Sequence, residues 1–193
     1  NLTSVSQYRL AAHLSAALVL FLSLIWVARR LEPPATDPAA RLTRRWPAAV
    51  LLGLVAVQMA AGAFVAGLHA GMGYNTWPLM DGAIIPDGLG AIEPLWRNLF
   101  ENAMTVQFVH RCIAYLIGVY VAILVWRQGR AGGFAGVNGW LPRLGALALL
   151  QVALGITTLL TFVQLPLALG HQALAFMLAG ATMAYLAHLN RLR

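Results

Sequence analysis

The chain alternates between long apolar runs and shorter polar or arginine-rich stretches. A helix needs about 20 mainly apolar residues to cross roughly 30 Å of hydrocarbon, where it satisfies its own backbone polar groups. Five runs meet this length, and we expect helices over about residues 8–28, 47–68, 102–126, 144–162 and 165–188. The pattern therefore predicts an all-α fold, a polytopic membrane bundle with one transmembrane helical domain over residues 1–193.

Composition agrees with a membrane protein. Of the 193 residues, 60% are hydrophobic and 10% are charged, and the mean hydropathy is +0.73. The formal net charge of +7 comes from 13 arginines without any lysine, and most of them lie at the ends of apolar runs, where bilayer proteins carry positive charge. We therefore expect membrane lipid, and no nucleic acid, as a partner. A lone Cys112 excludes a disulfide framework, and we expect it to be a buried packing residue.

The arginines also predict an orientation. They concentrate between the first two helices, between the third and fourth, and at the C-terminus, which by the positive-inside rule places these segments in the cytoplasm. The N-terminus of this chain and the loop over residues 69–101 then lie outside. The chain opens at Asn1 without the order of regions typical of a signal peptide, so we expect further sequence upstream.

Two kinds of helix alternate along the chain. Two predicted helices share the spacing Gln-x-x-x-Gly, and the other three carry a histidine shortly after their start. In chain order these residues are His13, Gln58 with Gly62, His110, Gln151 with Gly155, and His171. Repeated helical hairpins are common in membrane folds, and small residues there mostly serve close helix packing. Packing accounts for the glycines, but it leaves the histidines unexplained.

The three histidines share one layer near the outer face. At 1.5 Å per residue, His13 lies about 7 Å from the outer helix end, His110 about 12 Å and His171 about 9 Å. Ionisable groups inside a membrane are costly and usually functional. His69 and His188 lie at helix ends, where water or head groups reach them, and we interpret them as structural.

Three imidazoles at one depth favour a metal site over histidines that only bond to a neighbouring helix. Zinc takes four donors, and the layer offers no acidic side chain beyond Glu101. A heme iron takes one histidine from each side, while its propionates pair with arginine. Arg111 and Arg9 are candidates for that pairing, and for Arg9 surface anchoring is an equal alternative.

The order of the repeat predicts which histidines share an iron. His110 and His171 form the matched pair of one half, as axial ligands of one heme. His13 takes the place of His171 in its own half, and its partner would lie two helices earlier. The sequence therefore predicts one complete heme site and half of another.

Several segments resemble the heme A synthase family in its proteobacterial and mitochondrial form. They are SQYRLAAHL, AGLHAGMGYNTWPLMDG, IPDGL, LWRNLFENAMTVQFVHR and LPLALGHQ, and the resemblance covers essentially all 193 residues. The family implies eight helices in two pseudo-symmetric halves, so this chain would hold the second four-helix half plus the last helix of the first. It also implies oxidation of the C8 methyl of heme O to a formyl group, which makes heme A.

The resemblance implies roles for the candidate residues. His110 and His171 would hold a permanent heme b that accepts electrons, with Arg111 beside it, and His13 with Arg9 would belong to the substrate heme. The catalytic residues are unknown, because an acidic residue is expected in the absent N-terminal half. Gln107 stands where the family motif has glutamate, and an amide cannot shuttle a proton. We therefore do not expect these 193 residues alone to be catalytically active.

Three hypotheses follow. The first is a heme-modifying oxidoreductase of the bacterial inner membrane, with heme O as substrate, heme O synthase and an electron acceptor as partners, and a homo-oligomer left open. The second is a b-type cytochrome subunit for membrane electron transfer, which gives His13 no role. The third is a transporter, which the off-centre polar layer and the unbroken helices disfavour.

Overall fold

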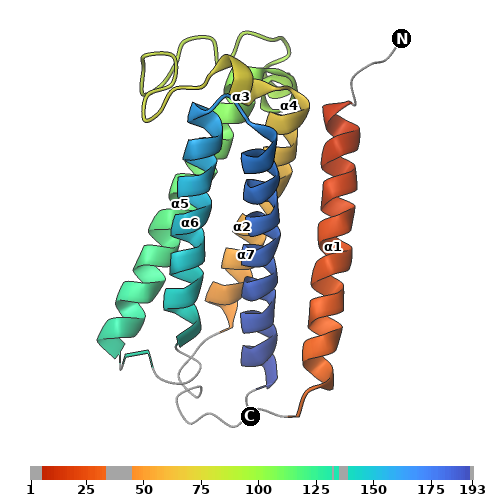
Figure 1. The fold of residues 1–193 in the computed structure, drawn as a ribbon, viewed down its shortest axis with the longest axis vertical. Helices are drawn as coiled ribbons and strands as arrows, with labels where there is room; N and C mark the ends of the chain where they lie inside the picture. Colours follow the sequence, from red (N-terminus) through yellow and green to blue (C-terminus); the bar gives the residue numbers. More distant parts are fainter. Residues whose placement is uncertain (1–5, 34–44, 132, 135–138, 192–193) are drawn as a thin grey trace.

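The computed structural model is an all-helical bundle, and it describes residues 6–33, 45–131, 133–134 and 139–191 (Figure 1). Five described helices are long and apolar enough to cross a membrane, which confirms the all-α, five-span prediction. They are α1 (Gln7–Leu31), α2 (Trp46–Gly67), α5 (Ala103–Ala131), α6 (Trp140–Leu160) and α7 (Leu165–Arg191).

The helix ends differ most from expectation on the side of the C-terminus. Helix α5 continues to Ala131 instead of ending near residue 126, and α6 begins at Trp140 instead of residue 144. Arginines extend α5 because their long side chains can reach water from a helix end. Pro142 fits within the first turn of α6, where its missing N–H has no helical partner to lose.

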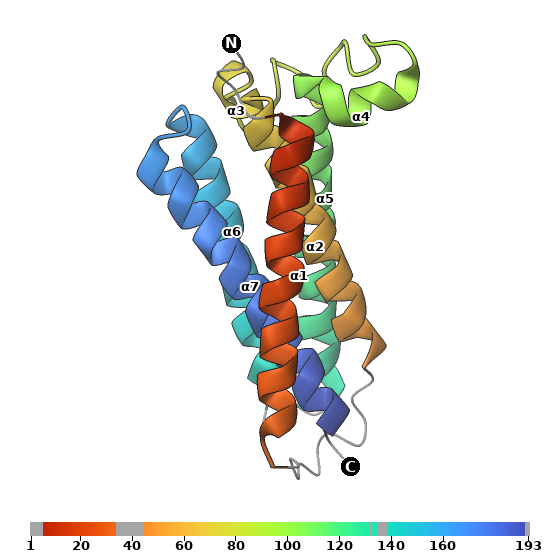
Figure 2. The ribbon, with the colours of Figure 1, turned by 90° about the vertical axis from the view of Figure 1, so that its right-hand side faces the viewer.

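Helices α2, α5, α6 and α7 form a ring in which each contacts its two neighbours, so α5 and α7 lie across the ring from each other. Helix α1 packs outside this ring, against α2 and α7 (Figure 2). Close approach there depends on small residues: a Cβ on Gly67 would lie 2.6 Å from Gln7 of α1, and one on Gly180 would lie 3.0 Å from Phe21. The chain thus holds a four-helix bundle with one additional helix on its side.

Tight packing concentrates at the end of the bundle where the chain terminates, which we call the C-terminal end. The buried cluster there includes Leu51, Val55, Val121, Leu144 and Tyr185. At the opposite end, which we call the loop end, α6 and α7 lean away from α1 and α2 (Figure 2). Dispersion contacts hold helices together in lipid, so the C-terminal end fixes the bundle and the loop end is packed less tightly.

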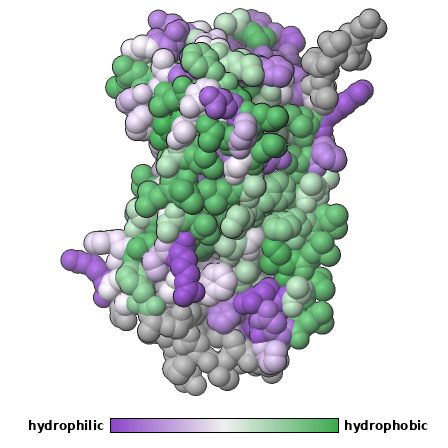
Figure 3. Space-filling model, viewed as in Figure 1, coloured by the Kyte–Doolittle hydropathy of each residue, from purple (hydrophilic) through white to green (hydrophobic). Residues whose placement is uncertain are grey.

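The outer surface matches a lipid-facing protein. On the face seen in Figure 3, a hydrophobic band crosses the middle of the molecule between more hydrophilic ends. Exposed apolar side chains on α1 include Val19, Leu20, Leu24 and Val27. Bilayer lipid or further membrane helices must cover these large exposed hydrophobic residues, since soluble monomers rarely expose contiguous patches of this kind.

Charged contacts tie the helices together at the C-terminal end. Arg191 of α7 and Arg29 of α1 both pair with Glu32, at 2.5 and 2.7 Å. Arg45 at the start of α2 donates to the Asn190 side chain at 2.7 Å. Other arginines of the predicted cytoplasmic segments, Arg41, Arg44 and Arg193, lie outside the described residues, as does Asn1.

A structured loop covers the loop end. It contains α3 (Ala70–Gly73), a short 3-10 turn (Leu95–Arg97) and α4 (Asn98–Glu101). Asn98 is buried and bonds the backbone of Ile92 in both directions, at 3.0 and 2.6 Å. Asn102 donates to the Gly88 carbonyl at 2.9 Å. Side-chain amides therefore replace regular secondary structure in holding this loop.

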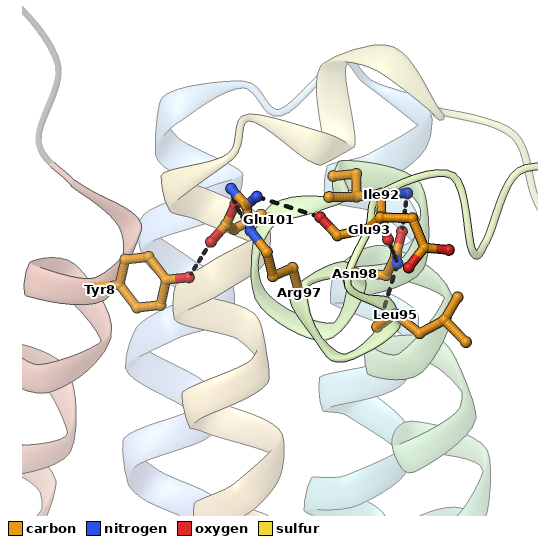
Figure 4. A network of polar contacts seen from close by, with 7 residues as sticks. All are labelled: Tyr8, Ile92, Glu93, Leu95, Arg97, Asn98 and Glu101. Atoms are coloured by element: carbon orange, nitrogen blue, oxygen red, sulfur yellow. Dashed lines mark hydrogen bonds and ion pairs between the residues drawn. The ribbon is translucent and has the colours of Figure 1, made fainter.

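One polar network connects the loop to α1 (Figure 4). The Tyr8 hydroxyl donates to Glu101 Oε1 at 2.9 Å, and Arg97 Nε donates to Glu101 Oε2 at 2.9 Å. Arg97, and to a lesser degree Tyr8, lowers the pKa of the Glu101 carboxyl through these hydrogen bonds. Glu101, whose role the sequence left open, thus anchors α1 to the cap.

We predict that Glu101→Gln lowers the midpoint of thermal unfolding in detergent by no more than a few degrees at neutral pH, because the network is exposed. Since the pKa of Glu101 is lower in the folded state, its stabilisation is present above the unfolded pKa and is lost as pH falls through the folded pKa. The difference between parent and variant should shrink in acid. Glu93→Gln is the control, and a difference that stays constant with pH would contradict this role.

Candidate heme-binding site

His110 of α5 lies against α2. Its imidazole Nε2 is 3.2 Å from the side-chain Nε2 of Gln58, and the Gln58 amide donates to the ring nitrogen in the tautomer that leaves this nitrogen unprotonated. A Cβ built on Gly62, one turn after Gln58, would lie 3.1 Å from His110 Cε1. The ring of His110 therefore sits between an amide and the bare backbone of the neighbouring helix.

His171 of α7 lies against α6 in the same way. Its Nε2 is 3.4 Å from Gln151 Nε2, and the Gln151 amide also donates to the His171 backbone carbonyl at 3.0 Å. A Cβ on Gly155 would lie 2.7 Å from His171 Cε1, closer than Cβ atoms normally approach. The glycine is needed here because any larger residue would displace the ring.

The two clusters are repeats of one arrangement. Gln58 precedes Gly67, the end of α2, by nine residues, and Gln151 precedes Leu160, the end of α6, by nine residues as well. Residues four apart lie on one face of a helix, so Gln-x-x-x-Gly presents both groups to the same partner. The glycines, which we interpreted as general packing residues, contact the histidines themselves.

The three histidine depths agree more closely than expected from the sequence. His13 follows Gln7 by six residues, His110 follows Ala103 by seven, and His171 follows Leu165 by six. At 1.5 Å per residue they lie about 9, 10.5 and 9 Å from their helix starts. His110 and His171 therefore lie at one level of the four-helix bundle, on α5 and α7, which are on opposite sides of it.

Unpaired polar atoms mark this level. Among the described residues, Nδ1 of both His110 and His171 is buried without a hydrogen-bond partner, and so is Oε1 of both Gln58 and Gln151. An axial imidazole needs one nitrogen free for iron and the other held by a protein group. Both histidines are half-buried although their rings lie against a neighbouring helix. These residues fit a heme held by two histidines.

Arg111 points to the loop in this structure. Its guanidinium donates to the backbone carbonyls of Thr76 at 2.8 Å and Tyr74 at 3.2 Å, and to Gln107 Oε1 at 3.1 Å. The buried Gln107 amide in turn donates to the Tyr74 carbonyl at 2.9 Å. Gln107 and Arg111 thus fasten the loop over α5, and pairing of Arg111 with a propionate stays a prediction.

His13 and Arg9 share an exposed face of α1, one turn apart. The buried face of α1, with Ala11, Leu18 and Leu22, packs against the bundle instead. The structure therefore does not bring His13 to His110 or His171. This separation is consistent with a different site for His13, which stays a prediction.

The three remaining candidate residues are Cys112, His69 and His188. Cys112 is exposed, so the prediction of a buried packing thiol is wrong. It lies on the outward face of α5, where lipid rather than a neighbouring helix would cover it. His69 is exposed in the turn after α2, and the His188 ring lies 6.4 Å from that of Trp140.

We predict that Gly155→Ala displaces the His171 imidazole and removes most of the bound heme, although alanine favours a helix by about 1 kcal/mol. Gly62→Ala should have a smaller effect, because its Cβ would lie farther from the ring. Gly53→Ala on α2 is the control, since nothing lies within 4 Å of its Cβ position. The measurement is heme per purified protein, and equal heme in all three variants would contradict the role of the glycines.

Comparisons with known proteins identify the family of this chain. The family model described as "Cytochrome oxidase assembly protein" matches residues 1–183. The heme A synthase of Azorhizobium caulinodans is 51% identical over 98% of this chain and 54% of its own length. Those of Allorhizobium ampelinum and Brucella anthropi are 46% and 44% identical, over 95% and 96% of this chain and 50% and 52% of theirs.

This chain spans about half the length of the curated relatives it matches. No solved structure matches it. The relatives favour the heme-modifying hypothesis over the electron-transfer subunit, and they agree with the multi-pass helical architecture. The chain belongs to the heme A synthase family of cytochrome oxidase assembly proteins.

Proposed function

We propose that this chain holds a heme b between His110 and His171, and that it does so as part of a heme A synthase that oxidises the C8 methyl of heme O to a formyl group. The observation that carries the proposal is the pair of His–Gln–Gly clusters at one depth on helices that lie across the ring. The names of the relatives support the substrate assignment.

The chain's own residues would contribute binding and orientation. His110 and His171 would supply the two axial nitrogens, while Gly62 and Gly155 let the rings lie close to the neighbouring helices. A heme with two axial histidines has no open position for oxygen and therefore supplies electron transfer. The tightly packed core at the C-terminal end would keep water away from the inner side of the site.

His13 and Arg9 would serve the substrate heme in the whole protein. Both side chains lie on the face of α1 that points away from the four-helix ring. The relatives are about twice as long as this chain, and we place their further helices on that side. A catalytic acid or base is expected on those helices, because Gln107 is occupied with the loop and cannot carry a proton.

The proposal includes a cellular setting. We place the protein in the bacterial inner membrane, with the loop end and the N-terminus of this chain outside and the C-terminus in the cytoplasm. Heme O would be the substrate, heme O synthase would deliver it, and a further partner would accept the electrons. The positions of the arginines, which gather at the C-terminal end, support this orientation.

The first test is spectroscopic. Purified protein should show the reduced absorption bands of a low-spin heme b, and His110→Ala or His171→Ala should abolish them because each removes an axial ligand. His13→Ala, the matched control, should keep them. An unchanged spectrum in all three variants would refute the pairing.

The second test separates the enzyme from a plain b-type cytochrome. Cells that supply heme O should accumulate heme A when they express the whole protein, and His13→Ala should reduce that product strongly while the heme b bands remain. Pigment extraction and chromatography measure both. Bound heme b without any formyl product would favour the electron-transfer subunit.

A further inference from the structure

We propose that Gln58 and Gln151 are positioning residues that hold the two axial imidazoles through their side-chain amides and thereby set the electron affinity of the heme iron. This inference rests on the heme site proposed above. It assigns a role to the Gln-x-x-x-Gly spacing, which the ligand assignment alone does not use.

The geometry places each amide on the edge of its histidine. The distances of 3.2 Å in the first cluster and 3.4 Å in the second are within hydrogen-bond range. The Gln151 amide also donates to the His171 backbone carbonyl at 3.0 Å, which keeps the side chain beside the residue that it orients. Each glutamine comes from the helix next to the histidine helix. Each amide therefore fixes the rotation of the imidazole relative to that neighbouring helix.

The glycines restrict the ring from another side. Cε1 of His110 lies 3.1 Å from the Cβ position of Gly62, and Cε1 of His171 lies 2.7 Å from that of Gly155. Neither ring can therefore swing farther toward the neighbouring helix. The amide and the glycine together hold each imidazole so that it faces the interior of the four-helix bundle.

The chemistry of a ligated imidazole explains why the partner is an amide. When one ring nitrogen binds iron, the other carries the proton and needs an acceptor. A glutamine amide has both a donor and an acceptor, and a half-turn of its end group exchanges them. In both clusters the amide Nε2 faces the ring in this structure, and Oε1 is buried without a partner among the described residues. The half-turn that brings Oε1 to the ring therefore breaks no hydrogen bond of Oε1, and for Gln151 it exchanges the N–H bond to the His171 carbonyl for the bond to the ring.

An acceptor on that N–H has a measurable consequence. It gives the imidazole more anionic character, makes it a stronger ligand and stabilises ferric over ferrous iron, so the midpoint potential of the heme falls. Removing the acceptor raises the potential, and a carboxylate, which can only accept, lowers it further. A glutamine that merely fills space would not give opposite shifts for these two replacements.

The experiment uses the whole protein purified with its heme. Gln58→Leu and Gln151→Leu should lower heme affinity roughly 10- to 100-fold and raise the midpoint potential of the heme that remains. Gln58→Glu and Gln151→Glu should retain heme and lower the potential. Gln128→Leu is the control on α5, because Gln128 donates to the Gly133 carbonyl at 3.3 Å, far from the ligand layer, and should leave both quantities unchanged.

The outcomes separate this inference from the proposed function. If the parent binds heme but the leucine and glutamate variants shift the potential in one direction, or leave it unchanged, the positioning role is overturned and the heme site stands. If the leucine variants fail to accumulate, the glutamate variants decide alone: a lowered midpoint potential supports the positioning role, and an unchanged or raised potential overturns it. A parent protein without heme would overturn the proposed function itself.

Discussion

The imidazoles of His110 and His171 are each confined between a glutamine amide and a glycine of the neighbouring helix, and the rest of the candidate site depends on this confinement. An imidazole in a membrane interior must satisfy its nitrogens without water, so its partners have to come from adjacent helices. The spacing Gln-x-x-x-Gly provides the polar partner and the clearance from one helix face. Because the arrangement occurs twice, two imidazoles reach the same level from α5 and α7, which lie on opposite sides of the four-helix bundle.

The remainder of the fold keeps this arrangement in place from both ends. At the C-terminal end, a buried cluster and the contacts of Glu32 with Arg29 and Arg191 hold α1 and α7 together. At the loop end, Gln107 and Arg111 fasten the loop to α5 through backbone carbonyls. The less tightly packed layer between these two regions is where the unpaired ring and amide atoms lie. The contacts that hold the bundle together and the candidate heme-binding side chains thus lie at different levels along its length.

Much of this architecture could be predicted from the sequence, because bilayer thickness fixes the length of an apolar run and arginines mark its ends. The alternation of histidine and Gln-x-x-x-Gly helices was visible as well. Its meaning was not, since a spacing along one helix does not reveal which neighbour it faces. The exposure of Cys112 and the loop contacts of Arg111 depend on the rotation of α5 about its axis, which a uniformly apolar helix does not disclose.

The central claim is that the imidazoles of His110 and His171 bind one iron from opposite sides. X-ray absorption at the iron K edge of the purified protein tests it most directly, because scattering from imidazole rings reports how many are bound. The account predicts two imidazoles on a six-coordinate iron, and one imidazole after replacement of either histidine. A single imidazole in the parent protein, or two in either variant, would contradict it.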